Sequence, residues 1–281
     1  EPYNPQTTLI AAYFDSLDDM QAAVEQLNSK VDSPSALEMV DKHLLELVDT
    51  INPNQLKGVI EAPYPAAVLL IEFDESSDRA QAKLAKKALK ILENYTQRVE
   101  KETDPLLQEK LWKIRHSSAA VIAHQAGTKK ALPIIEDGVV PLDKFKEYIT
   151  DVYELFARHR LEAAVWGHAG DANLHMQPFL DLGQVGDRQQ IFRIMDEYYS
   201  LVMSLGGSTS GEHNDGRLRG PYLERLYGQQ IYALFQKIKL ICDPYGTMNP
   251  GVKMNVTIDD LKPILRTQFS MEHLYDHLPR S

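Results

Sequence analysis

The chain has 281 residues, of which 43% are hydrophobic and 25% are charged, a composition typical of a folded globular protein. Its formal net charge of −10 argues against a nucleic-acid partner, because phosphate binding depends on clustered lysine and arginine. The most apolar run, residues 66–71, is too short to cross a bilayer, so no transmembrane segment is expected. The single cysteine, Cys242, permits no internal disulfide, which suggests a cytoplasmic protein.

The first hundred residues repeat a β-α-β pattern. Each repeat begins with an apolar run typical of a strand, continues with an amphipathic helix, and closes with a return strand. The expected strands are residues 9–14, 36–40, 66–73 and 96–100, and the expected helices carry apolar faces within 20–27, 44–48 and 80–95. Such a duplication favours an α+β, ferredoxin-like fold, in which an antiparallel sheet carries helices on one face.

From Asp104 onward the pattern becomes mostly helical. Helices are expected from residue 105 to a turn at 127–130 and at 141–160, 190–205, 221–241 and 259–265, with strands at 131–136, 163–166 and 173–179. Cys242 ends the apolar stripe of the helix at 221–241, so it is expected in the core. No linker separates these segments, and the sequence predicts one compact domain over residues 1–281.

Two segments concentrate groups that bind metals or move protons. Residues 167–175, Gly-His-Ala-Gly-Asp-Ala-Asn-Leu-His, carry two imidazoles, and the pair Glu212-His213 adds a carboxylate and a third imidazole. His168 and His175 converge only if the Gly-Asp pair between them turns the chain, which these residue types favour. Two imidazoles and one carboxylate form a common catalytic zinc set. Glu212 is therefore expected to bind a metal and His213 to exchange protons.

Two other functions fit the same residues. One is a metal-dependent hydrolase, in which the His-His-Glu set activates water and His213 acts as the base. The other is an acidic interaction module without catalysis, whose histidines only close turns. The residues by themselves leave these alternatives open.

Three motifs follow one another in the second half of the chain. They are residues 167–175, residues 210–217 (Ser-Gly-Glu-His-Asn-Asp-Gly-Arg) and residues 243–251 (Asp-Pro-Tyr-Gly-Thr-Met-Asn-Pro-Gly), preceded by blocks at 111–115 and 135–141. In order and spacing they resemble the C-terminal half of FAD-linked oxidases of the vanillyl-alcohol-oxidase type. The subgroup implied is the D-2-hydroxyacid dehydrogenases, which act on D-lactate, glycolate or D-2-hydroxyglutarate.

The resemblance covers residues 9–253 and implies a substrate, or cap, domain without the FAD-binding domain that precedes it in the family. The chain begins with Glu1 instead of methionine, which is typical of a processed product or a piece of a longer polypeptide. The implied partners are a small 2-hydroxy acid, the FAD domain and an electron-acceptor protein. The implied location is the cytoplasm or the periphery of a membrane.

The resemblance also implies a role for each matched residue. His213 is similar to the base that removes the substrate hydroxyl proton while a hydride leaves C2 for the flavin. The metal implied is divalent zinc, manganese or iron. The positions carried over are His168, His175 and Glu212 for the metal, His213 for the base, Arg115, Lys130 and Gln177 for the substrate, and Asn249 for FAD.

The sequence departs from the family's pattern in the turn between the histidines. Ala172 stands where Gly-Asp-Gly-Asn has its second glycine, so the turn is strained if this position needs a positive φ. Lys253 is displaced by one position from the family's lysine. Simpler roles also stay open, with Arg115 and Lys130 as solvated residues and Asn249 as a turn former before proline.

Overall fold

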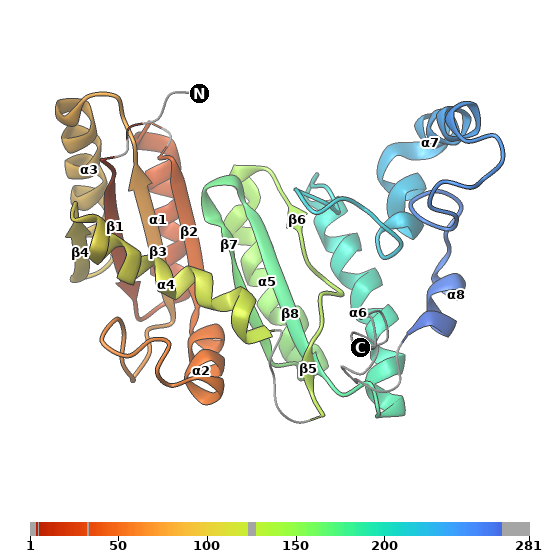
Figure 1. Ribbon diagram of the computed structural model, residues 1–281, viewed down its shortest axis with the longest axis horizontal. Coiled ribbons are helices and arrows are strands. Elements are labelled where there is room, and N and C mark those ends of the chain that lie inside the picture. The colour runs from red at the N-terminus through yellow and green to blue at the C-terminus, as the bar shows by residue number, and fades with distance from the viewer. Residues whose placement is uncertain (1–3, 5, 33, 123–127, 266–281) are drawn as a thin grey trace, which may run out of the picture.

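The two β-α-β patterns form one half of an antiparallel sheet. The computed structural model describes residues 4, 6–32, 34–122 and 128–265. The first half consists of β1 (Thr8–Phe14), α1 (Leu17–Lys30), β2 (Ala36–Asp41), α2 (Lys42–Ile51), β3 (Ala67–Phe73), α3 (Asp78–Leu92) and β4 (Arg98–Glu102). Its strands lie in the antiparallel order β4-β1-β3-β2. This order is that of a ferredoxin-like fold and confirms the predicted α+β class (Figure 1).

Polar capping residues set where these helices begin. Ser16 caps α1, Asp41 caps α2 and Ser77 caps α3, each by accepting a hydrogen bond from the backbone N–H three residues further on. The cap satisfies one of the N–H groups that the first helical turn leaves unpaired. Because Asp41 is also the last residue of β2, the strand passes directly into α2.

The histidine motif adds a second half to the sheet. This part of the chain contains the strands β5 (Lys130–Ala131), β6 (Gly138–Val139), β7 (Ala163–His168) and β8 (Asn173–Leu180). Its helices are α4 (Pro105–Ile122) and α5 (Phe145–His159). β7 pairs with β2 and with β8, which extends the sheet to the order β4-β1-β3-β2-β7-β8-β5. The strands predicted at 163–166 and 173–179 therefore form a hairpin that carries the histidines.

The predicted strand at residues 131–136 is wrong. Only Ala131 lies in a strand there, and the following residues turn before β6. Pro133 has no N–H group to donate to a neighbouring strand. The carbonyl group of Ile134 instead accepts a hydrogen bond from the hydroxyl group of Tyr199. These apolar residues consequently pack against α6 (Val185–Ser204) and do not extend the sheet.

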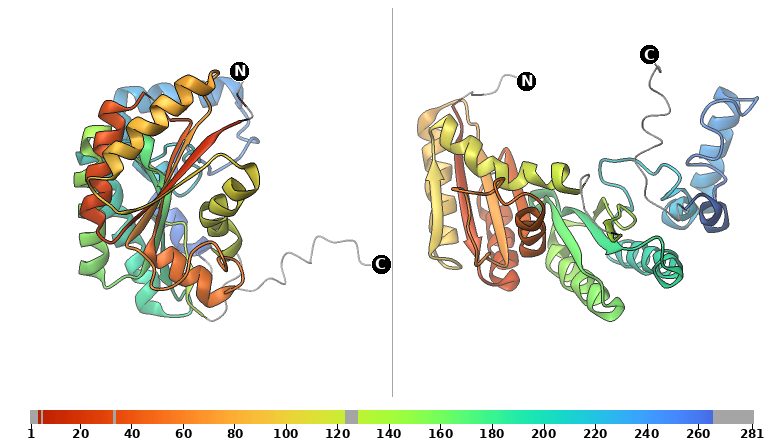
Figure 2. Two further views of the ribbon diagram at one scale, coloured as in Figure 1. Left: turned by 90° about the vertical axis from the view of Figure 1, so that its left-hand side faces the viewer. Right: turned by 60° about the horizontal axis from the view of Figure 1, so that its bottom comes forward.

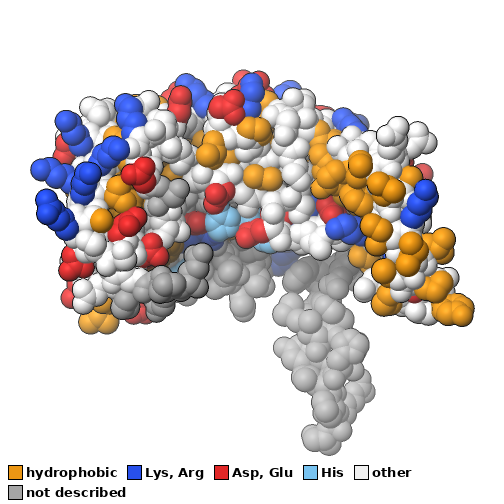
Figure 3. Space-filling model, turned by 90° about the horizontal axis from the view of Figure 1, so that it is seen from above, with side chains coloured by type: hydrophobic (Ala, Val, Ile, Leu, Met, Phe, Trp, Pro, Cys, Tyr) orange, Lys and Arg blue, Asp and Glu red, His pale blue; other side chains and the backbone are white. Residues whose placement is uncertain are grey.

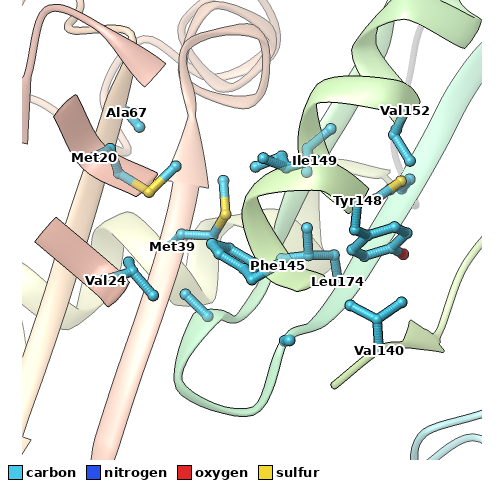
Figure 4. Packing of buried hydrophobic residues seen from close by; sticks show 14 of the residues in the cluster. Met20, Val24, Met39, Ala67, Val140, Phe145, Tyr148, Ile149, Val152 and Leu174 are labelled. Carbon is cyan, nitrogen blue, oxygen red and sulfur yellow. The ribbon is translucent and has the colours of Figure 1, made fainter. Parts of the chain in front are cut away.

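Helices cover both faces of the sheet. α1, α3, α5 and α6 pack on one face, and the additional helices α2 and α4 pack on the other (Figure 2). Alternate strand residues point to opposite faces, so Ile10 belongs to the first core and Leu9 to the second. Figure 4 shows Met20, Met39 and Phe145 meeting where α1, β2 and α5 pack together. Apolar burial on both faces provides the main driving force for this arrangement.

The C-terminal helix α7 (Leu223–Cys242) lies apart from the sheet. It follows η3 (Gly220–Tyr222) and precedes α8 (Ile258–Leu261) and η4 (Lys262–Ile264) at one end of the molecule (Figure 1). Several of its apolar side chains are exposed, and Figure 3 shows hydrophobic side chains gathered at this end. Cys242 is exposed as well, so its predicted place in the core is wrong: the stripe that it ends faces outward. Among the described residues, no helix combines the length and apolar composition needed to span a bilayer.

Candidate functional site

The turn between β7 and β8 presents the two histidines of the motif. His168 ends β7, a single 3-10 turn (η2, Ala169–Asp171) follows, and His175 lies near the start of β8. Gly167 has φ 147°, and a Cβ there would lie 2.6 Å from a backbone oxygen of the opposite strand, so glycine is required. Ala172 adopts a left-handed conformation with φ 53°. The position where the motif loses a glycine is therefore one that favours glycine.

Three imidazoles converge on one carboxylate oxygen. The Nε2 atoms of His168, His175 and His213 lie 3.1, 3.2 and 3.3 Å from Oε1 of Glu212. The His175 and His213 rings stack with their centroids 4.8 Å apart, and the His168 ring meets His175 edge-on. Figure 3 shows histidine side chains at the surface in the middle of the molecule, between acidic groups. The tertiary structure thus brings together the four residues that the two motifs contain.

Two of these histidines are also oriented by another glutamate, a different one for each ring. Nδ1 of His168 lies 2.6 Å from Glu38 Oε1, and Nδ1 of His213 lies 3.0 Å from both oxygens of Glu136. Because a carboxylate accepts the Nδ1–H proton, Nε2 of each neutral ring is left with its lone pair. Both lone pairs then face the negatively charged Glu212. A bound cation, or protonation of one imidazole, satisfies such a group of acceptors.

The surroundings shift the pKa values of His168 and His175 in opposite directions. The hydrogen bond to Glu38 raises the pKa of His168 above its usual value, although burial opposes this shift. Burial, together with the neighbouring imidazoles of His213 and His168, lowers the pKa of His175 to about 4. His175 is therefore neutral at physiological pH, and the neutral imidazole is the form that coordinates a metal.

The donor atoms of the cluster are those that zinc, manganese and iron accept, namely imidazole nitrogens and a carboxylate oxygen. The predicted set of His168, His175 and Glu212 is assembled. The buried Nδ1 of His175 has no hydrogen-bond partner among the described residues. His213 Nε2 is almost as close to Glu212, so it suits either a further ligand or a nearby base. On this chemistry the residues fit a divalent cation.

Two predicted substrate contacts lie beside the cluster. Nε of Arg115, from α4, donates to Glu38 Oε2 at 2.6 Å, so Arg115 is joined to His168 through Glu38. Burial raises the pKa of Glu38, but the hydrogen bond to His168 and the charge of Arg115 outweigh it and hold this pKa below its usual value. Gln177 lies two residues beyond His175, on the same face of β8. Its buried Oε1 has no hydrogen-bond partner in the described part of the chain.

Two other predicted site residues lie away from the cluster. Lys130 pairs with Leu180 in the sheet, five residues along β8 from His175, or about 17 Å at the usual rise of a strand. Asn249 is exposed in the loop after α7 and lines a cavity of about 480 Å³. Asp215, two residues after His213, lines the same cavity. Asn249 is therefore near the Glu-His segment, whereas Lys130 is not brought to the histidines.

Four charged residues around the cluster are not apparent from the motifs: Glu38, Glu136, Asp137 and Arg219. Glu38 is the one acidic residue before Asp41 in the otherwise apolar strand β2, which is the signal that marks it. Glu136 and Asp137 belong to the matched block at 135–141, for which the resemblance supplied no role. Buried Arg219 places Nη1 3.2 Å from Glu136 Oε1, a contact that nothing in the sequence indicates.

Residues 4–252 match the family model of the C-terminal domain of FAD linked oxidases. The chain belongs to this family. The FAD-linked oxidase domain is 29% identical over 252 residues to a D-lactate dehydrogenase of Archaeoglobus fulgidus and 27% identical over 255 residues to the glycolate oxidase subunit GlcD of Bacillus subtilis. These alignments cover 89% and 88% of this chain but 52% and 51% of the relatives. The chain thus spans about half the length of these curated relatives.

Further comparisons agree with this family. The FAD-linked oxidase domain is 27% identical over 168 residues to a D-2-hydroxyglutarate dehydrogenase of Pantoea ananatis, which covers 60% of this chain and 16% of that protein. Its fold is similar to that of 4-ethylphenol oxidase from Gulosibacter chungangensis, with a TM-score of 0.68 and 15% identity over 92% of this chain and 55% of that one. At this identity the likeness shows the fold alone. The resemblance inferred from the motifs is confirmed.

Proposed function

We propose that this domain binds the substrate and a divalent metal in a flavin-dependent dehydrogenase that oxidises a D-2-hydroxy acid to a 2-oxo acid. The observation that carries the proposal is the convergence of three imidazole nitrogens on Glu212 Oε1, next to the Arg115–Glu38 ion pair. The names of the relatives supply the substrate class, which is D-lactate, glycolate or D-2-hydroxyglutarate. All of residues 1–281 are assigned to this domain, and the flavin to a separate FAD-binding domain.

His213 is the base in this proposal. Oxidation of the substrate removes a proton from the hydroxyl group and a hydride from C2, and flavin provides the hydride acceptor. Glu136 holds Nδ1 of His213, which leaves Nε2 free to take the proton. The stacked ring of His175 fixes the plane of the His213 imidazole. The side chain of His213 is half-exposed, so the proton can pass on to water.

His168, His175 and Glu212 hold the metal in this proposal. A divalent cation there lowers the pKa of a bound hydroxyl group and stabilises the charge that develops on it. Glu38 orients the ring of His168, and burial keeps His175 neutral. The protein therefore presents His175 in the neutral form that binds a cation and holds the His168 ring in place beside it.

Arg115 and Gln177 contact the substrate in this proposal. A guanidinium group matches the geometry of a carboxylate, and Arg115 uses Nε for Glu38 while Nη1 lies 3.3 Å from Ser118 Oγ. Among the described residues, no hydrogen bond involves the other terminal nitrogen, which is the one proposed to bind the substrate carboxylate. The Oε1 of Gln177, which has no hydrogen-bond partner within the described residues, provides an acceptor on the same face of β8 as His175. Lys130, which lies further along the sheet, has the weakest support as a substrate contact.

The flavin domain is proposed to contact the end of the molecule that α7 forms. Asn249 lies there beside exposed apolar side chains of α7. Lys253 Nζ lies 2.8 Å from Asp215 Oδ2 and connects this loop to the segment that carries His213. In this proposal the ion pair therefore connects the loop that contacts the flavin, through Asn249, to the segment that acts on the substrate, through His213. An electron-acceptor protein and a location at the periphery of a membrane stay predictions from the resemblance.

Joining this chain to the FAD-binding half of the Archaeoglobus fulgidus relative tests the proposal. We expect D-lactate, glycolate or D-2-hydroxyglutarate to bleach the flavin absorbance of the fusion without oxygen. His213→Ala is expected to slow this reduction by at least about 100-fold, because a positioned base contributes about 10² to 10⁴ in rate. The matched control is His43→Ala, since His43 is a half-exposed histidine of α2 that forms an ion pair with Glu46 and lies outside the histidine cluster. This control should reduce its flavin at the native rate.

Elemental mass spectrometry of the same fusion tests the metal. We expect about one divalent cation per chain in the native protein and its loss in His168→Ala, because His168 is one of three ligands. A folded, FAD-loaded fusion that none of the three acids reduces would contradict the proposed function. Metal-dependent ester hydrolysis by such a protein would favour the hydrolase instead. Absence of metal together with absence of both activities would favour the interaction module.

A further inference from the structure

Asp137 binds the backbone of both residues of the Glu-His pair. Its Oδ1 accepts from the N–H of Glu212 at 3.0 Å, and its Oδ2 accepts from the N–H of His213 at 2.9 Å. Two side chains complete the arrangement, because Ser210 Oγ donates to Oδ2 at 2.8 Å and Asn173 Nδ2 lies 3.3 Å from Oδ1. The carboxylate is completely buried, at 0% exposure, and both of its oxygens are occupied.

The backbone of Asp137 connects the same loop to the sheet. Its carbonyl oxygen accepts from Gly211 N at 2.7 Å, and its N–H donates to the carbonyl oxygen of Leu174 in β8 at 3.1 Å. Asp137 has φ 67°, a left-handed conformation that is strained for most residues other than glycine, asparagine and aspartate. One residue therefore joins the loop that carries Glu212 and His213 to the strand that carries His175.

Buried tyrosines anchor the segment that carries Asp137. The N–H of Gly138 donates to the hydroxyl oxygen of Tyr198 at 3.2 Å, and the hydroxyl group of Tyr148 donates to the Gly138 carbonyl oxygen at 3.4 Å. The two hydroxyl groups lie 2.7 Å from each other. Because these residues come from α5 and α6, Asp137 is fixed to the helical layer beneath the sheet.

Arg219 balances the buried charge and holds the far side of the loop. Its Nη2 lies 3.5 Å from Asp137 Oδ2 and donates to the carbonyl oxygen of Asn214 at 2.6 Å. Its Nη1 lies 3.2 Å from Glu136 Oε1, the carboxylate that orients His213. The loop at 211–214 is therefore held on one side by Asp137 and on the other by Arg219.

From these contacts we infer that Asp137 is a positioning residue: it fixes Glu212 and His213 against His168 and His175, and it is not a metal ligand. Ligand atoms of Asp137, His175, Glu212 and His213 all lie within 4.8 Å of one another, so proximity alone would include Asp137 among the ligands. Coordination of a cation by Asp137 would, however, release the N–H groups that it holds. The inference rests on the proposed function, because the arrangement that Asp137 maintains is that metal and proton-transfer site.

Asp137→Asn tests this role, since asparagine tolerates the left-handed conformation but replaces one acceptor oxygen with a donor. The matched control is Asp41→Asn. Asp41 is also a buried aspartate that accepts from two backbone N–H groups, those of Leu44 and Val165, and from one hydroxyl group, that of Tyr153. None of these three partners belongs to the histidine cluster, so any effect that is general to replacing a buried, hydrogen-bonded aspartate will appear in both variants.

The first readout is calorimetric titration of the purified chain with Zn²⁺ and, separately, Mn²⁺. We expect Asp137→Asn to raise the Kd by at least about tenfold, the lower end of what losing a group that orients ligands costs. Asp41→Asn should keep the native Kd. Native affinity in Asp137→Asn, or an equal loss of affinity in both variants, would overturn the inference.

The second readout needs no metal. In the metal-free protein, hydrogen exchange at the amides of Glu212 and His213 should be slow in the native chain and in Asp41→Asn, and at least about tenfold faster in Asp137→Asn, because an exposed amide exchanges as soon as its local structure opens. Fast exchange of these amides in the native chain would overturn the inference. A native chain that binds neither ion would count against the metal of the proposed function, while the exchange result still decides the role of Asp137.

Discussion

The sheet buries its apolar side chains, whereas helix α7 exposes many of its own. Ile71 in β3 has 0% of its surface exposed, whereas Ile238 in α7 has 59% exposed. Burial of apolar surface contributes about 25 cal/mol per Å², so the side chains of the sheet stabilise the fold and those of α7 contribute little by themselves. The sheet and the helices that cover it therefore bury their own apolar surface, whereas α7 does not. In the function proposed above, the flavin domain covers this apolar surface of α7.

The largest expected effect comes from truncating one isoleucine in each region. Ile71→Ala should lower the free energy of unfolding by about 2 to 5 kcal/mol, because it leaves a cavity between β3 and the helices that cover it. Ile238→Ala should change it by no more than about 0.5 kcal/mol, since exposed sites rarely contribute more. Urea unfolding of both variants measures the contrast. A similar loss in both would mean that α7 is packed as tightly as the sheet.

A smaller change in the free energy of unfolding is expected with pH, because two aspartates have pKa values shifted in opposite directions. Asp41, at the end of β2, is buried, and burial raises its pKa to about 6. Asp243, after α7, accepts from Lys239 Nζ at 2.7 Å, and this hydrogen bond lowers its pKa to about 2. A raised pKa gives stability that is complete below the unfolded value of about 4 and is lost as the pH rises through 6. A lowered pKa gives stability that is present above about 4 and is lost as the pH falls toward 2.

Unfolding of Asp41→Asn and Asp243→Asn between pH 3 and pH 7 checks these signs. One pKa unit corresponds to about 1.4 kcal/mol, so the stability of the native chain relative to Asp41→Asn should fall by about 2 to 3 kcal/mol from pH 4 to pH 7. Relative to Asp243→Asn, it should instead fall as the pH decreases below 4. A difference from Asp41→Asn that does not vary with pH would show that folding leaves the pKa of Asp41 at its unfolded value.

The smallest expected change in stability, that of Ala172→Gly, belongs to a comparison of two positions with positive φ. Gly228 interrupts α7 with φ 79°, and a Cβ there would meet no atom within 4 Å. Gly228→Ala should therefore destabilise the chain by at least about 1 kcal/mol through backbone strain alone, because φ 79° with ψ 157° is a combination that residues with a Cβ rarely adopt. Ala172→Gly, in the turn of the sheet, should stay within about 0.5 kcal/mol of the native value, because relief of strain is offset by the loss of a buried methyl group. Thermal unfolding of the two variants tests this difference.

Local pattern predicted most of the sheet and its helices. Caps such as Ser16 and Ser77 lie next to amphipathic runs, and both signals are contained within a few residues. The same kind of signal failed at residues 131–136, where an apolar run is typical of a strand but packs as a turn against α6. It failed again at Cys242, because periodicity shows that a helix has an apolar face but not whether anything covers it.

For the candidate site, the sequence by itself determined which groups carry the chemistry, because His168, His175, Glu212 and His213 lie in short motifs of unusual composition. Only the tertiary structure decided which neighbours orient these groups. Glu38 comes from a strand 130 residues before His168, and Asp137 lies 75 residues before Glu212. Pairing of β2 with β7, and packing of the Asp137 segment on α5 and α6, bring them into contact. Contacts over such separations depend on the whole fold, so no local pattern specifies them.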